Sequence, residues 1–165
     1  MESLAQDRIA PQICALEASH CFAIYDRVLL TIWRLEVTAE AVTDMRRIGK
    51  RLVADARGPV CILSVIEQTS PAPGEKLRAA ISAFYRELAS STKQQIILPE
   101  GSGFRVAMVR SVGVALSAIA RGSLPFKFVS SVEEAAALIS PHLSPSAGGA
   151  AGLLSAIDNV RAQMR

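Results

Sequence analysis

The 165-residue sequence has few of the residues that build disulfide, metal and nucleic-acid sites. Its three cysteines are an odd number without CxxC spacing, and its two histidines are far apart in the chain. This pattern favours reduced thiols and predicts neither a metal site nor a cofactor. Aromatic residues make up 5% of the chain and do not alternate with basic ones, so a nucleic-acid partner is not expected.

Long apolar runs are also missing. No stretch approaches the roughly 20 apolar residues of a membrane span, and the first residues lack the basic-then-apolar order of a secretory leader. The net charge is +3, from 18 basic and 15 acidic residues spread along the chain, which identifies no partner. We therefore expect a cytoplasmic protein without a membrane partner, with one domain and a short appendage.

The sequence does contain a regular exchange of short apolar runs and amphipathic patterns. β-Branched runs bounded by Pro, Gly or Ser predict buried strands at residues 60–66, 95–98 and 126–129. Apolar residues three and four positions apart predict helices over about 39–56, 75–90, 106–119 and 132–139. Two earlier apolar runs separated by Asp26 and Arg27 predict an antiparallel hairpin. This order predicts βαβ crossovers and a largely parallel sheet.

The order of elements, closed by the sequence Phe-Val-Ser-Ser-Val-Glu-Glu-Ala at 128–135, resembles the STAS-type, SpoIIAA-like domains of anti-sigma-factor antagonists. The resemblance implies a mixed α/β sheet that opens with a β-hairpin, followed by alternating α and β elements with the helices mainly on one face. The resemblance covers about residues 21–143, and the STAS-like domain is placed at residues 12–143. Residues 144–165 are interpreted as a flexible linker and a C-terminal amphipathic helix.

In that family, the loop after a central strand carries a phosphorylatable Ser, usually within Asp-Ser-Ser-Gly. The equivalent loop here, residues 67–74, offers Thr69 and Ser70, but it lacks the Asp and contains two prolines. The sequence therefore predicts no stoichiometric phosphate on this loop.

A second loop is a candidate for chemistry because it joins a predicted strand to a helix N-terminus, where backbone N–H groups can bind an anion. It comprises Gly101, Ser102, Gly103, Phe104 and Arg105. One hypothesis is a nucleotide or phosphate site in which Arg105 supplies a bidentate donor. The alternative is that the two glycines only form a tight turn. A third hypothesis is a Ser-dependent hydrolase in which Ser102, His20 and Asp26 form a catalytic triad, although their spacing in the sequence does not specifically indicate one.

The C-terminal helix carries a narrow apolar stripe, formed by Leu153, Ile157, Val160 and Met164. This stripe can dock on its own domain, fray, or bind a partner. The hairpin has apolar residues on both faces, which favours either a sheet-mediated homodimer or a cover made by the terminal segments.

No stretch contains a complete catalytic signature. The hypothesis that fits best is a non-catalytic regulatory or scaffolding protein of the bacterial cytoplasm that acts through protein–protein contacts. A small anionic-ligand binding module and a small Ser-dependent hydrolase remain as alternatives.

Overall fold

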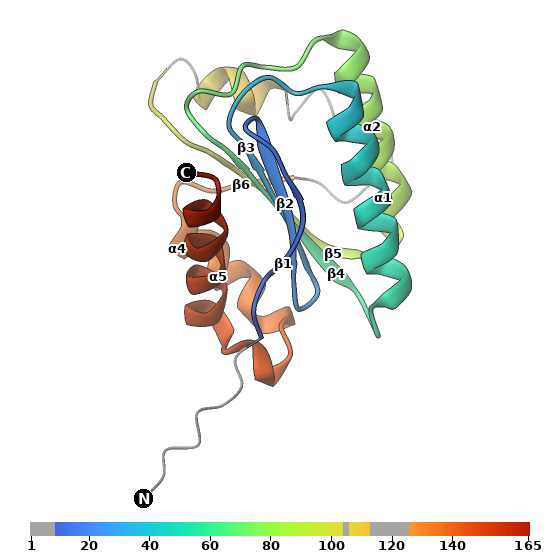
Figure 1. Cartoon of the computed structure of the whole chain (residues 1–165), viewed down its shortest axis with the longest axis vertical. Coiled ribbons are helices and arrows are strands. Elements are labelled where there is room, and N and C mark those ends of the chain that lie inside the picture. The colour runs from blue at the N-terminus through green and yellow to red at the C-terminus, as the bar shows by residue number, and fades with distance from the viewer. Residues whose placement is uncertain (1–8, 104–105, 113–125) are drawn as a thin grey trace, which may run out of the picture.

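A computed structural model describes residues 9–103, 106–112 and 126–165 (Figure 1). Its core is one six-stranded mixed sheet in which spatial order follows chain order. The first two pairings are antiparallel, and the other three are parallel. The α/β class, the hairpin and the parallel part of the sheet are therefore confirmed. The strands are β1 (Gln12–Leu16), β2 (His20–Tyr25), β3 (Val28–Trp33), β4 (Val60–Ile66), β5 (Thr92–Pro99) and β6 (Lys127–Phe128).

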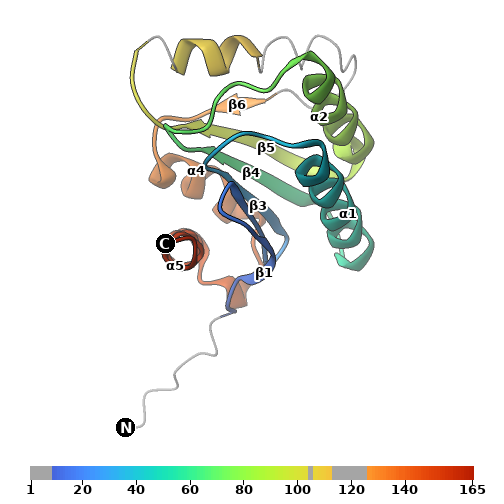
Figure 2. The ribbon, with the colours of Figure 1, turned by 45° about the horizontal axis from the view of Figure 1, so that its top comes forward.

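Helices cover both faces of the sheet, whereas the sequence predicted them mainly on one. Helices α1 (Ala39–Asp55) and α2 (Glu75–Leu88) lie on one face, and α4 (Val132–Ile139) and α5 (Gly149–Gln163) lie on the other (Figures 1 and 2). Right-handed crossovers between successive parallel strands place their helices on the same face. Because α4 and α5 follow the last strand, this constraint does not apply to them.

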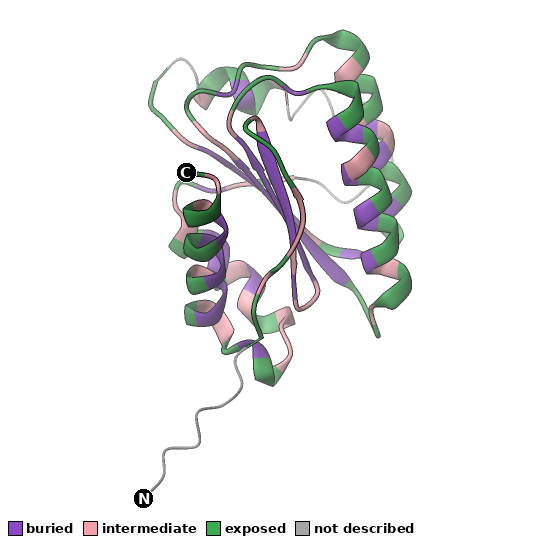
Figure 3. Ribbon diagram, viewed as in Figure 1, coloured by how far each residue is buried: buried purple, intermediate pink, exposed green. Residues whose placement is uncertain are grey.

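Two separate apolar clusters result, one on each side of the sheet. Along β3, Leu30 and Ile32 point to the α5 side, while Leu29 and Trp33 point to the α1 side. The central strands are buried on both faces, which explains their nearly continuous apolar sequences (Figure 3). The doubly apolar hairpin that suggested a homodimer is thus covered within one chain.

Two helices begin as the sequence predicts. The Thr38 hydroxyl accepts a hydrogen bond from the Ala41 N–H at 3.1 Å, and the Ser131 hydroxyl accepts one from the Glu134 N–H at 3.1 Å. These caps satisfy backbone donors that the first helical turn leaves unpaired.

The segment predicted as a flexible linker is attached to the hairpin turn. It contains the short 3-10 helix Pro145–Ala147, and a second 3-10 helix, Ser140–His142, precedes it. Ser144 donates from its backbone N–H and its hydroxyl to the Asp26 carboxylate, at 2.8 and 2.9 Å. Helix α5 follows and completes the cluster on its side of the sheet.

The predicted C-terminal stripe docks on the chain's own sheet. Leu153, Ile157 and Val160 are at most 1% exposed, and Met164 is partly buried beside them. These three side chains therefore offer no surface to a partner, which corrects their interpretation as a partner-binding stripe. None of the described helices is long and apolar enough to cross a membrane.

Candidate ligand-binding cavity

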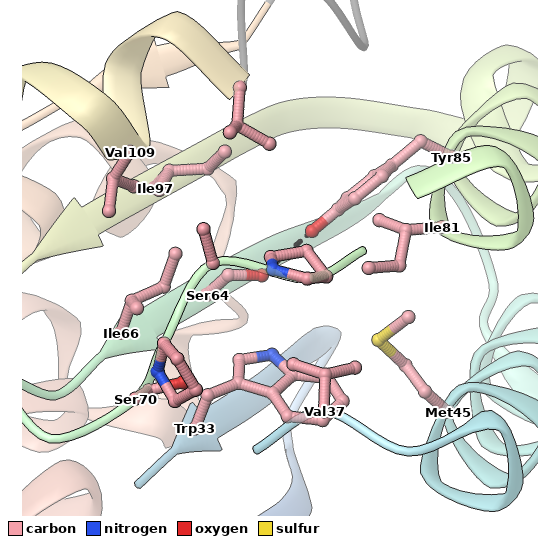
Figure 4. Close-up of a pocket in the computed structure, with 14 residues that line it drawn as sticks. Trp33, Val37, Met45, Ser64, Ile66, Ser70, Ile81, Tyr85, Ile97 and Val109 are labelled. Atoms are coloured by element: carbon pink, nitrogen blue, oxygen red, sulfur yellow. Dashed lines mark hydrogen bonds between the residues drawn. The ribbon is translucent and has the colours of Figure 1, made fainter. Parts of the chain in front are cut away.

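A cavity lies at the carboxyl ends of parallel strands β3, β4 and β5, on the face covered by α1 and α2 (Figure 4). We call it the Ser64 cavity. Strand, helix and loop side chains surround it: Trp33, Val37, Met45, Ser64, Ile66, Ser70, Pro71, Ala72, Pro73, Ile81, Tyr85, Ile97, Val109 and Val112.

The local sequence explains why a space remains here. The loop over the cavity contains Pro71 and Pro73, which lack the N–H that a strand or helix needs, so the chain continues as an extended cover. Its hydroxyls attach it to the segment after β3. Thr69 Oγ1 donates to the Arg34 carbonyl oxygen at 2.5 Å, and Ser70 Oγ donates to that of Leu35 at 2.9 Å.

A chain of three hydroxyls runs from the sheet to the cavity wall. Thr31 Oγ1 donates to Ser64 Oγ at 2.9 Å, and Ser64 Oγ is 2.8 Å from the Tyr85 hydroxyl. Thr31 and Ser64 are register partners on neighbouring strands, while Tyr85 reaches them from α2. All three are at least 95% buried, so the network is held in a low-dielectric environment.

Burial raises the pKa of Tyr85 to about 12, an effect opposed by its hydrogen bond with Ser64. The phenol is therefore uncharged at neutral pH and acts as a hydrogen-bonding group, not as a base.

Trp33 adds an indole N–H to a wall that is mostly apolar. Its indole lies along the cavity with its nitrogen on the edge that faces Ser64 (Figure 4), and the residue is 6% exposed. Within the described part of the chain, this N–H makes no hydrogen bond, and its nitrogen keeps some access to solvent. No ionisable acid or base except the neutral Tyr85 lines the cavity among the described residues.

The cavity has a volume of about 70 Å³ and is partly open to solvent. The arrangement suits a compact, mostly apolar molecule with one polar atom.

Histidine does not assist Ser64. His20 packs behind Trp33 with ring centroids 5.7 Å apart, and its Nδ1 lies 2.9 Å from the Ser19 hydroxyl. Burial lowers the pKa of His20 despite the opposing charge of Glu17. Across the described ranges, no three His, Cys, Asp or Glu side chains are grouped to hold a metal ion.

Comparison with known proteins gave no match. Neither a family model nor a curated protein nor a solved structure is significantly similar to the chain.

The structure places Thr69 and Ser70 over the Ser64 cavity, with both hydroxyls hydrogen-bonded and Ser70 only 3% exposed. In the second candidate loop, Gly101 and Gly103 have φ values of +107° and +63°, in the left-handed region that favours glycine. Ser102 is exposed between them. Phe104 and Arg105 lie outside the described residues.

The structure does not bring together the residues of the hydrolase hypothesis as a catalytic triad. His20 begins β2, whereas Asp26 follows its end, so the two are separated by about 20 Å of extended strand. Asp26 instead accepts hydrogen bonds from Ser144.

Sequence reasoning did not select Ser64, Tyr85 or Trp33 as site residues. Ser64 gave a usable signal, because it is the one hydroxyl in the otherwise apolar run of β4. No sequence signal marked Tyr85 or Trp33 as a site residue, since the position of each is also explained by the apolar pattern of its helix or strand. Their convergence depends on how α2 packs over the parallel strands.

A cluster of charged residues lies beside the cavity. Arg34, just after β3, binds Glu67 at the start of the covering loop through two contacts of 2.6 and 3.1 Å. Its Nη1 also donates to the Met164 carbonyl oxygen, at 2.5 Å, just after α5. The base of the covering loop is thus joined to the C-terminal helix.

Proposed function

We propose that this chain is a non-catalytic regulatory domain of the SpoIIAA-like class. It binds a small molecule in the Ser64 cavity and transmits the bound state to a partner protein through the loop at 67–74. The observation that carries the proposal is the position of the cavity directly beneath this loop, lined in part by Ser70, Pro71 and Pro73.

The resemblance supports the regulatory part. In STAS-type domains, the equivalent loop holds the hydroxyl whose phosphorylation alters partner binding. Here, Thr69 and Ser70 use their hydroxyls to hold the loop against the segment after β3. A ligand beneath the loop can strengthen or break these contacts and so replace phosphorylation as the input.

The output can reach beyond the loop through Arg34. This residue connects Glu67, at the base of the loop, to the carbonyl oxygen of Met164. A shift of the loop base therefore alters the surface formed by the loop and the end of α5. Leu35, which is 45% exposed beside this loop, provides an apolar contact for a partner.

A fragment screen by methyl NMR tests the proposal. Bound fragments should shift the methyl signals of Ile66, Ile97 and Val109, and they should change amide exchange in the covering loop. The blocking variant is Ile81→Trp, because Ile81 is a half-buried wall residue of α2. The matched control is Ala80→Trp, one position away on the exposed side of the same helix.

Binding should disappear in Ile81→Trp and persist in Ala80→Trp. Fragments that bind both variants equally would place the ligand elsewhere and contradict the proposal. Fragment binding that leaves exchange in the loop unchanged would support a ligand site without the regulatory output.

A further inference from the structure

We infer that the ligand of the Ser64 cavity is a small uncharged molecule with a carbonyl-type oxygen on an apolar frame. The inference rests on the proposed function and names the chemical class that this site recognises. It follows from the hydrogen-bonding capacity that the cavity wall leaves unused.

Three hydroxyls form the chain, but only two hydrogen bonds join them. Each hydroxyl has one hydrogen to donate. Thr31 uses its hydrogen on Ser64, and the second bond uses the hydrogen of either Ser64 or Tyr85. Whichever of these two donates, the hydrogen of the other is left over, and both residues line the cavity.

Trp33 supplies a second unused hydrogen. Its indole nitrogen is a donor only, it faces the same space, and no described residue accepts from it (Figure 4). Both unused hydrogens are donors in a mostly apolar site that is partly open to solvent. A buried donor without an acceptor is costly, so the ligand that fits best supplies an acceptor oxygen.

The charge of the wall residues and the size of the cavity restrict the class of ligand further. The described wall residues include no Lys, Arg or His that could offset a carboxylate or phosphate. Transfer of an unpaired charge into such a site is strongly unfavourable. The cavity volume of about 70 Å³ limits the part of the ligand that lies inside it to a small ring or a short branched chain.

Three probes of similar size test the inference by NMR titration. Cyclopentanone carries the carbonyl oxygen, methylenecyclopentane has the same shape without an acceptor, and butyrate carries a charge. Cyclopentanone should bind the wild-type protein about tenfold more tightly than methylenecyclopentane, which is the typical value of one hydrogen bond. Butyrate should bind weakest.

A triple variant, Thr31→Val with Ser64→Ala and Tyr85→Phe, removes the whole hydroxyl chain. All three changes are needed together. If only Ser64 or only Tyr85 is replaced, the hydroxyl of the other still has a hydrogen to donate to the ligand. If both are replaced but Thr31 is kept, the Thr31 hydroxyl is left buried without a partner. The preference for cyclopentanone should fall to about threefold or less in this variant, with the Trp33 N–H remaining. Thr31→Val alone is the control, since it removes a hydroxyl that does not line the cavity, and the preference should stay at about tenfold.

The outcomes separate the two claims. Equal binding of cyclopentanone and methylenecyclopentane to the wild-type protein would overturn the ligand class but leave the small-molecule site intact. Tightest binding of butyrate would also overturn the class. A preference that survives in the triple variant would show that the hydroxyl chain does not recognise the oxygen. If none of the probes shifts the cavity methyl signals, both the ligand class and the proposed function fail.

Discussion

The hydroxyl of Tyr25 donates a hydrogen bond to the carbonyl oxygen of Ala147, which lies 122 positions later in the chain. Tyr25 ends β2 and is 2% exposed, and Ala147 ends the short 3-10 helix before α5. This contact and the Asp26–Ser144 hydrogen bonds attach the C-terminal segment to the first hairpin. The packing at this point leaves no room for a larger residue at Gly152.

Gly152→Ala should destabilise the protein even though alanine favours helices. A Cβ atom at this position would lie 1.8 Å from the Ala147 carbonyl oxygen and 2.6 Å from the Tyr25 hydroxyl. Because the nearer atom belongs to the backbone, α5 must move, which should cost about 2 kcal/mol or more. Urea denaturation measures this loss. Gly74→Ala, with no atom within 4 Å of the added Cβ, is the control, and a similar loss there would refute the explanation.

Thiol labelling should distinguish Cys14 from the other two cysteines. Burial raises the pKa of both Cys21 and Cys61 to about 11, so their reactive thiolate forms are scarce at pH 8. Cys14 is half-buried on the edge strand. Ellman's reagent should therefore modify one thiol rapidly in the folded protein and three in urea. Rapid modification of two or three thiols before unfolding would contradict this packing.

The loop over the cavity should carry no stoichiometric phosphate. Ser70 is 3% exposed, and its hydroxyl donates to the Leu35 carbonyl oxygen, so a kinase would have to open the loop first. Intact-mass spectrometry of protein from its native host should show no added phosphate. A phosphate located at Thr69 or Ser70 would restore the phosphorylation switch of STAS-type domains.

Substitutions in the second candidate loop should separate a turn from an anion site. Gly103 has a φ of +63° with open space around its Cα, so Gly103→Ala should cost about 1 kcal/mol through backbone strain alone. Arg105→Ala should leave the melting temperature nearly unchanged, with or without inorganic phosphate. A phosphate-dependent stabilisation of the wild-type protein that Arg105→Ala abolishes would establish the anion site instead.

The contact between α1 and α2 should weaken in acid. Hydrogen bonds from Arg46, with a further one from Lys50, hold the pKa of Glu87 below its usual range. A carboxyl whose pKa is lower in the folded state stabilises that state above its unfolded pKa, and the effect is lost as the pH falls through the folded value.

Glu87→Gln should therefore reduce the loss of stability below about pH 4.5. The difference should be under about 1 kcal/mol, because the side chain is 32% exposed. Denaturation across the acid range measures it, and 1 M NaCl should diminish it. An unchanged acid profile would show that the ion pair contributes nothing.

The elements that sequence reasoning predicted best have a strong local signal. The run at 60–66 matches β4 at both ends, and Thr38 and Ser131 cap their helices as expected. Prediction was poorer where polar residues are buried. Strand β5 begins at Thr92, three residues before the predicted start, because the missed residues Thr92, Lys93 and Gln94 are polar, although Thr92 is only 8% exposed.

The faces of the helices and the cavity depend on contacts between distant residues, which periodicity cannot show. The C-terminal stripe indicated an amphipathic helix, but not that Tyr25 and Gly152 would hold it against β2. Ser64 and Tyr85 are 21 positions apart and meet only because α2 crosses back over β4. A hydrogen-bonded pair of this kind has no sequence pattern of its own.

The sequential order of the strands has a consequence for how the molecule assembles during synthesis. Every strand pairs with the one made just before it, so none has to be inserted between two partners that are already joined. The crossover helices α1 and α2 can cover their face as soon as β4 and β5 have emerged. The opposite face of β2 and β3 is covered by α4 and α5, which are made after the six strands of the sheet. The apolar surface of β2 and β3 is therefore synthesised well before the helices that cover it. We expect a nascent chain to depend most on chaperones at this face of the sheet.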